Sequence, residues 1–218
     1  DAANTLLDEA GLDNRGPDGI RLLPDGRPME IVIETAGERQ EVENAIQIIT
    51  DDWREVGVKL VMRPLDRDIL RNRIFSGATM AGVWYGWDNG IPRSYTSPDY
   101  LAPRHQEFFA WPKWGQFYQT LGAAGEAPDL PEPKRLMELA HDWEIASTRE
   151  ERDAAWVEML KIHADQIYGI GTLSEVPQPV VVNKNLRNVP ETGLWAWEPG
   201  AHFGIHRIDE FYFVDGSG

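Results

Sequence analysis

Residues 29–62 have the sequence MEIVIETAGERQEVENAIQIITDDWREVGVKLVM, and this stretch decides the fold. It opens with an apolar strand over residues 29–35. Within residues 38–56 the apolar side chains recur at steps of three and four, which indicates one face of a helix. Gly57 is suited to end that helix, and a second apolar strand follows over residues 58–62. This order predicts two strands joined by a crossover helix.

The alternation continues on both sides of this stretch. Asp66 is suited to cap a helix that ends at Gly77, and residues 79–84 form the next predicted strand. Upstream, a helix over residues 1–10 precedes a strand over residues 19–23, which a Pro-Asp-Gly turn joins to the strand at 29–35. We therefore predict an α/β fold with a mixed sheet flanked by helices.

The rest of the chain is less regular. Residues 88–130 are rich in loops, prolines and aromatic side chains, which predicts an ordered insertion with a short helix over residues 113–121. Two long helices follow, one over residues 131–146 and one opened by a capping box that begins at Thr148. Strands are expected at residues 167–173 and 179–182, and an irregular aromatic tail from residue 190. The side chains expected to be buried by the two helices are Leu136, Leu139, Ala140 and Trp143, and Ala154, Val157, Leu160 and Ala164.

The composition limits the function. The formal net charge of −15 argues against nucleic acid or an anionic membrane surface as partner, because phosphate contacts need a basic surface. There is no apolar run near the ~20 residues that a membrane span needs. The chain has no cysteine, which excludes disulfides, thiolate metal sites and cysteine nucleophiles. It starts directly with a predicted helix, so we expect it to begin inside a longer protein.

No catalytic or metal-binding pattern stands out. His202 and His206 are four residues apart, but their neighbours predict an extended chain, which would separate them by about 13 Å. The serines lack the context of a nucleophile elbow. Residues 13–19 are rich in Asp and Gly but lack the spacing and the final glutamate of a calcium loop, and we expect a turn there. The sequence thus predicts no enzyme, no cofactor and no metal site.

A ligand site is predicted after the strand at residues 79–84. The stretch WYGWDNGIP at residues 84–92 supplies flat apolar rings, an acid and glycines, and ligands of open α/β sheets bind where strands end. Large aromatic side chains commonly line such sites. The alternative is a small core that holds the long loops together. The candidate ligand-binding residues are Trp84, Tyr85, Trp87, Asp88, Asn89 and Trp111.

Five stretches together carry a resemblance to a known family. They are NTLLDEAGL at residues 4–12, DGIR with PDG at residues 18–26, IQIITDDWREVGV at residues 46–58, WYGWDNGIP at residues 84–92, and VVVNKNLRNVP at residues 180–190. In this order they resemble the C-terminal half of a family 5 extracellular solute-binding protein. That family contains the dipeptide, oligopeptide and nickel receptors of ABC importers.

The resemblance implies a fold, a function and partners. The fold would be the C-terminal lobe of a two-lobed clamp of the periplasmic-binding-protein type II kind over residues 1–189. Residues 190–218 would form a tail that packs on the N-terminal lobe. The lobe would capture a small solute for an ABC permease, in the periplasm or outside the cell, with or without a lipid anchor on the full-length protein.

The resemblance also assigns a role to Asp88. In the dipeptide receptors an aspartate in a similar stretch pairs with the α-amino group of the peptide, and Asp88 matches it. This chain has one extra residue before the acid, and Ile91 replaces a second acid. Some family members stack sugar rings on aromatic side chains. Both a peptide and an oligosaccharide therefore remain open as the ligand, and an α/β enzyme domain is the alternative from another class.

Overall fold

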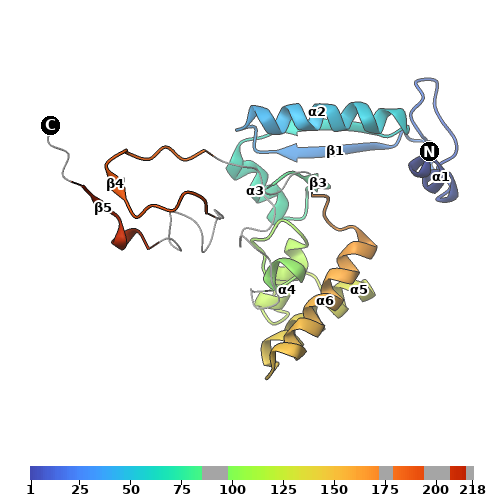
Figure 1. The fold of residues 1–218 in the computed structure, drawn as a ribbon. Coiled ribbons are helices and arrows are strands. Elements are labelled where there is room, and N and C mark those ends of the chain that lie inside the picture. The colour runs from blue at the N-terminus through green and yellow to red at the C-terminus, as the bar shows by residue number, and fades with distance from the viewer. Residues whose placement is uncertain (85–97, 172–178, 194–206, 215–218) are drawn as a thin grey trace. The chain divides into compact units, whose positions relative to one another are not determined.

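The computed structural model describes residues 1–84, 98–171, 179–193 and 207–214 of this chain (Figure 1). It divides into two compact units. The first unit comprises Asp1–Trp84 and His105–Ala127, and the second comprises Tyr85–Arg104 and Pro128–Gly218. The insertion after the third strand therefore contributes chain to both units.

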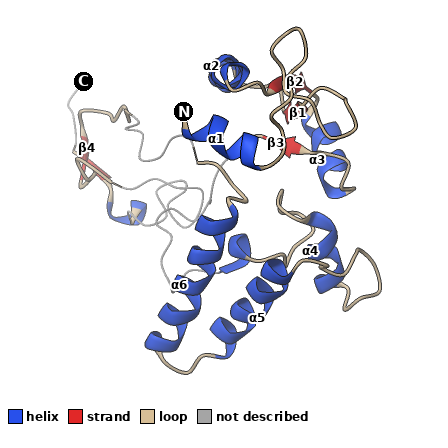
Figure 2. Ribbon diagram, turned by 90° about the vertical axis from the view of Figure 1, so that its right-hand side faces the viewer, coloured by secondary structure: helices blue, strands red, loops and turns tan. Residues whose placement is uncertain are grey.

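A parallel sheet forms the centre of the first unit. Its strands are β1 (Glu30–Thr35), β2 (Lys59–Pro64) and β3 (Ala81–Gly82), in the spatial order β2-β1-β3. Helices α2 (Gln40–Glu55) and α3 (Arg67–Phe75) make the crossovers. The two crossovers step in opposite directions across the sheet, so right-handed connections place the helices on opposite faces. Figure 2 shows this arrangement.

The strand register explains what each face carries. The charged pairs Glu30–Lys59 and Glu34–Arg63 lie on one face of the sheet, with the apolar pair Val32–Val61 between them. Ile31 and Ile33 point to the other face, where they pair with Leu60 and Met62. α3 buries Leu70 and Ile74 completely or nearly so, and its Arg73 reaches the face that carries Glu34. Asp66 caps α3 as predicted, because its carboxylate accepts hydrogen bonds from the Asp68 and Ile69 amides. The predicted α/β class is confirmed.

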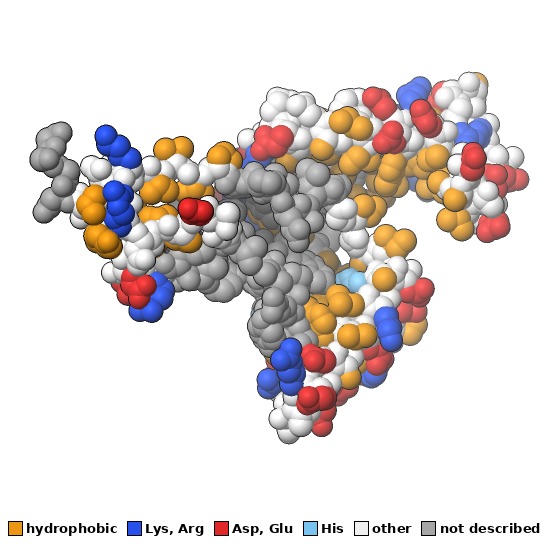
Figure 3. All heavy atoms as spheres, in the orientation of Figure 1, with side chains coloured by type: hydrophobic (Ala, Val, Ile, Leu, Met, Phe, Trp, Pro, Cys, Tyr) orange, Lys and Arg blue, Asp and Glu red, His pale blue; other side chains and the backbone are white. Residues whose placement is uncertain are grey.

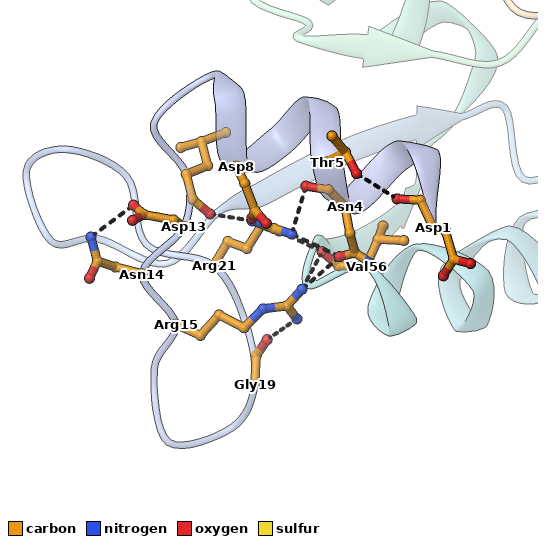
Figure 4. Close-up of polar contacts among 11 residues, drawn as sticks. Asp1, Asn4, Thr5, Asp8, Asp13, Asn14, Arg15, Gly19, Arg21 and Val56 are labelled. Atoms are coloured by element: carbon orange, nitrogen blue, oxygen red, sulfur yellow. Dashed lines mark hydrogen bonds and ion pairs between the residues drawn. The ribbon is translucent and has the colours of Figure 1, made fainter.

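Two arginines attach helix α1 (Ala2–Glu9) to the C-terminal end of α2 (Figure 4). The Arg21 side chain is 1% exposed and donates to the carbonyls of Val56 and Leu12 as well as to Asp8 and Asn4. Arg15 donates to the Gly19 carbonyl within the predicted turn and again to Val56. The last carbonyl groups of a helix lack partners within the helix. Arg15 and Arg21 supply donors to the Val56 carbonyl at the end of α2.

The strand predicted at residues 19–23 is wrong. Only isolated bridges form there, between Arg15 and Arg21 and between Leu22 and Pro28. The backbone of Arg21 instead donates to the carbonyl of Gly57 and accepts from the Met29 amide. This segment thus links the helix end to β1 without extending the sheet.

Two antiparallel helices dominate the second unit (Figures 1 and 2). They are α5 (Pro131–Ile145) and α6 (Arg149–Gln166), and the capping box of Thr148 and Glu151 is present as predicted. α5 buries Leu136, Leu139 and Ala140, also as predicted, whereas Trp143 is only half-buried. The buried face of α6 was predicted wrongly. The described side chains that α6 buries are Ala155, Trp156 and Met159, whereas Val157 and Leu160 are exposed.

The short helix η1 (Pro98–Leu101) packs against both α5 and α6. Arg104 is 9% exposed and forms ion pairs with Asp99, at 3.3 Å, and with Glu144 of α5. The Leu101 carbonyl lies 2.9 Å from Nε2 of His163 on α6. Polar contacts at both of its ends therefore attach η1 to the helix pair.

The C-terminal part of the second unit differs from the sequence prediction. The strands expected at residues 167–173 and 179–182 do not form in the described residues. Ile167 ends α6 in a left-handed conformation. Residues 168–171 and 179–182 pair with no neighbouring strand. A short antiparallel pair forms instead, between β4 (Leu186–Arg187) and β5 (Tyr212–Phe213). The single turn η3 (Ile208–Glu210) precedes β5. Hydrophobic side chains lie on the surface of this segment (Figure 3). Val181 and Phe213 are 98% and 65% exposed.

Candidate functional site

The candidate site lies where the parallel strands of the first unit end. β1, β2 and β3 all point the same way, so Thr35, Pro64 and Gly82 lie at one edge of the sheet. In open α/β sheets this edge is the usual place for a ligand, because the loops that leave it diverge and form a hollow. Trp84, the first of the predicted ligand-binding residues, lies two residues after the end of β3.

The structure describes two of the six predicted residues. Trp84 and Trp111 both belong to the first unit. Tyr85, Trp87, Asp88 and Asn89 fall in residues 85–97, outside the part of the chain that the structure describes. Their predicted roles are therefore untested.

Trp84 is held in an aromatic stack that joins the end of β3 to the insertion. Its ring centroid lies 4.4 Å from that of Phe109, with the planes tilted by 46°. Phe109 in turn meets Phe75 of α3 edge to face at 6.3 Å. Such pairs contribute about 0.5–1.5 kcal/mol each beyond their burial. Trp84 thus helps to hold the insertion on the sheet edge, as the small-core alternative predicted.

A cation also contacts the Trp84 ring. The guanidinium carbon of Arg67 lies 5.3 Å from the ring centroid, within the range of a cation–π interaction. Arg67 is held by Glu38 through two hydrogen bonds, from Nε at 2.8 Å and from Nη2. These hydrogen bonds lower the pKa of the Glu38 carboxyl below its ordinary value. The first turn of α3 therefore contributes to the surroundings of Trp84.

Trp111 stands at the start of helix α4 (Pro112–Gln119) in an unusual conformation. Its φ is +54° and its ψ +47°, the left-handed region that bulky side chains rarely adopt. Pro112 follows it and disfavours the right-handed helical conformation for the preceding residue. The ring of Trp111 is nearly parallel to that of Trp114, with an angle of 20° and centroids 6.4 Å apart. Strained residues of this kind cluster at functional sites.

α4 lies very close to the segment before it. An added Cβ on Gly115 would lie 2.2 Å from the carbonyl oxygen of His105, so only glycine permits this approach. His105 is further fixed by Gln119, whose side chain lies 3.0 Å from the Nδ1 atom. The two tryptophans at the start of α4 therefore stand on a rigid support.

Glu34 is the residue that the sequence analysis missed. Its side chain is 2% exposed near the end of β1, and it accepts hydrogen bonds from Arg63, Arg73 and Thr79. Burial on its own raises the pKa of the Glu34 carboxyl. The hydrogen bonds from Arg73, Thr79 and Arg63, together with the positive charge of Arg73, outweigh burial and leave that pKa below its ordinary value. A glutamate within the apolar run EIVIET was the available signal, since a buried carboxylate needs partners.

The described residues hold no group of three or more His, Asp or Glu side chains arranged to bind a metal ion. His202 and His206 lie outside the described ranges. His163 contacts the Leu101 carbonyl and packs edge to face on Tyr168, with centroids 5.7 Å apart. Within the described part of the chain, no helix is both long and apolar enough to cross a bilayer.

Solved structures supply the decisive comparison. The chain is 27% identical to the oligopeptide-binding protein OppA, with a TM-score of 0.66, over 86% of this chain and 31% of that one. The chain has the fold of part of an oligopeptide-binding protein. The resemblance to family 5 solute-binding proteins is thereby confirmed.

Two more distant structures show the same fold. AppA from Bacillus subtilis, in complex with a nonapeptide, is 12% identical with a TM-score of 0.58, over 97% of this chain and 37% of that one. The periplasmic binding protein MelB from Agrobacterium fabrum, in complex with stachyose, is 16% identical with a TM-score of 0.61, over 77% and 24%. The chain thus spans 24–37% of the length of these proteins. No protein-family model and no curated protein matches the sequence.

Proposed function

We propose that this chain is a ligand-binding lobe of an ABC-importer receptor and that it has no catalytic role. The observation that carries the proposal is the 27% identity to OppA over 86% of the chain. The receptor would act outside the cytoplasmic membrane and deliver its solute to a permease. Capture would occur by closure of two lobes, with the ligand favouring the closed population because it contacts both walls only there.

The proposed division of the chain rests on the sequence resemblance to family 5 solute-binding proteins. Residues 1–189 would form the C-terminal lobe, and residues 190–218 would be a tail that packs on the N-terminal lobe of the full-length protein. The short β4–β5 pair supports a need for a partner surface, since Tyr212 and Phe213 are 57% and 65% exposed. An isolated two-stranded pair is at best marginally stable in water.

Asp88 is the proposed anchor for a ligand amine. It follows Trp84 by four residues, and in the resembling dipeptide receptors an acid in this stretch pairs with the peptide's amino group. A charged hydrogen bond in a closed cleft is strong and costly to leave half made, which gives selectivity. Trp84, Tyr85, Trp87, Asn89 and Trp111 would line the same site.

An oligosaccharide is the second candidate ligand. The nearly parallel rings of Trp111 and Trp114 favour it, because flat apolar faces suit the stacking of sugar rings. MelB, which shares the fold, has been seen with stachyose.

Titration calorimetry on the full-length receptor, with short peptides and with oligosaccharides, tests the function and separates the two ligands. For a peptide receptor, Asp88→Ala should cost about 2–5 kcal/mol of affinity, because the ligand's cation loses its partner. For a sugar receptor, Trp111→Ala should cost more than Asp88→Asn. Asp51→Ala, on the exposed side of α2, is the control and should leave affinity unchanged. Binding of neither ligand class would contradict the proposal.

The chain by itself gives a second test. It would supply only one wall of the cleft, so it should bind neither ligand class tightly. Micromolar or tighter binding of a peptide or sugar by these 218 residues alone would contradict the half-clamp assignment.

A further inference from the structure

Glu34 holds together four parts of the first unit. Its carboxylate accepts from Nη1 of Arg63 on β2 at 3.1 Å, from Nε of Arg73 on α3 at 2.9 Å, and from Oγ1 of Thr79 at 2.6 Å. Its backbone carbonyl accepts from the Val83 amide at 3.0 Å. One residue of β1 thus contacts β2, α3 and the residues just before and just after β3.

The contacts converge on the segment that leads to the candidate site. Arg73, bound to Glu34, also donates to the Ala78 carbonyl at 3.2 Å. Residues 78, 79 and 83 are therefore all fixed by Glu34 or by its arginine. Trp84 follows directly, and the proposed ligand residues come next in the sequence. β3 itself pairs with β1 at only two positions, so these side-chain contacts carry much of its attachment.

Stability alone does not explain why the contacts of Glu34 with Arg63 and Arg73 are ion pairs. Replacing a buried ion pair by well-packed apolar residues is often neutral or stabilising, whereas a network of charged hydrogen bonds fixes a single geometry. Arg63 and Arg73 remain 49% and 35% exposed, so water reaches both cations while the carboxylate is fully enclosed. A fixed geometry is what a binding site requires of the elements that support it.

We propose that Glu34, with Arg73 and Thr79, is a positioning residue that sets where the chain leaves β3 and thereby determines ligand affinity. This inference rests on the proposed receptor function. Glu34 does not itself contact the ligand. It acts through the segment at residues 78–84.

Glu30 provides a matched control. It lies on the same strand and the same face as Glu34, and it pairs with Lys59 of β2 as Glu34 pairs with Arg63. Glu30 lies at the opposite end of β1 from the candidate site. Glu30→Gln and Glu34→Gln thus remove the same charge from two ends of one strand.

The test measures ligand affinity by calorimetry, and amide hydrogen exchange of residues 78–84 by mass spectrometry, on the full-length receptor. Glu34→Gln should weaken the binding of the peptide or oligosaccharide that the wild type takes by about tenfold or more and speed exchange of the Val83 amide by about tenfold. Glu30→Gln should leave both within about twofold. Thr79→Val, which keeps the ion pairs and removes only the hydroxyl, should show both effects in weaker form.

The outcomes separate this inference from the proposed function. If the wild type binds and Glu34→Gln matches Glu30→Gln in affinity and exchange, the positioning role is wrong while the receptor function stands. If Glu34→Gln does not fold, Thr79→Val decides, and unchanged affinity in that variant overturns the inference. If the wild type binds neither ligand class, the proposed function fails and the ligand role of Glu34 fails with it. The exchange of residues 78–84 then still shows whether Glu34 fixes this segment.

Discussion

Gly115→Ala is expected to destabilise the protein, although the same change stabilises most helices. In the interior of an exposed helix, alanine is favoured over glycine by about 1 kcal/mol. Gly115 lies within α4 but is buried against the backbone of His105. An added Cβ would lie 2.2 Å from the carbonyl oxygen and 2.4 Å from the carbonyl carbon of that residue. Tertiary packing thus reverses the sign that helix propensity predicts.

The magnitude follows from what has to move. Ordinary contact begins at 3.4 Å, so the helix and the His105 backbone must separate by roughly 1 Å. No side-chain rotation can relieve the overlap, because the obstructing atoms are backbone. Overpacking typically costs about 1–3 kcal/mol, and a rigid neighbour places this site at the upper end. With the propensity gain of about 1 kcal/mol subtracted, we expect a net loss of about 2 kcal/mol.

Urea unfolding of the Gly115→Ala variant measures the loss, and hydrogen exchange of the α4 amides localises it. Gly169→Ala is the control, because its added Cβ meets no atom within 4 Å. The control should stay within about 0.5 kcal/mol of the wild type. If Gly115→Ala proves as stable as the wild type, or more stable, then α4 does not approach His105 as described. The claim that this close contact holds Trp111 rigidly would then be wrong.

Three further predictions concern stability. Arg21→Met should lower the free energy of unfolding in urea by about 3 kcal/mol, because the part-buried carbonyls of Leu12 and Val56 lose their donor. Exposed Arg27→Met should change it by less than about 0.5 kcal/mol. Asp66→Ala should cost about 1 kcal/mol through loss of the α3 cap, and a variant as stable as the wild type would contradict the cap. Burial lowers the pKa of His163 below 6.5, although the hydrogen bond with the Leu101 carbonyl acts in the opposite direction. Just below pH 6.5 the folded state therefore binds fewer protons than the unfolded state. The stability from His163 is therefore present above pH 6.5 and lost as the pH falls below it, and His163→Gln should remove this part of the pH dependence of thermal unfolding.

The sequence predicted those features that depend on residues a few positions apart. The α2 periodicity, the Asp66 cap and the capping box of Thr148 and Glu151 are local patterns, and all three form. The order of strands and helices follows from them, and with it the edge where the candidate site lies. Trp84 and Trp111 could be selected from the sequence because large aromatic side chains after strands and in loops commonly line ligand sites. This argument does not require their contacts to be known.

Other features were decided by segments distant in the sequence. The Glu34 carboxylate meets Arg63, Arg73 and Thr79, which lie 29, 39 and 45 residues further along the chain. α6 carries apolar side chains on more than one face, so only its packing against α5 and η1 decides that Trp156 is buried and Val157 is not. Trp84 likewise meets Phe109 only once the insertion returns to α3. Interactions between residues close in the sequence determine helix periodicity and caps. Which of several apolar faces becomes buried depends on close packing between distant segments, and therefore on the whole fold.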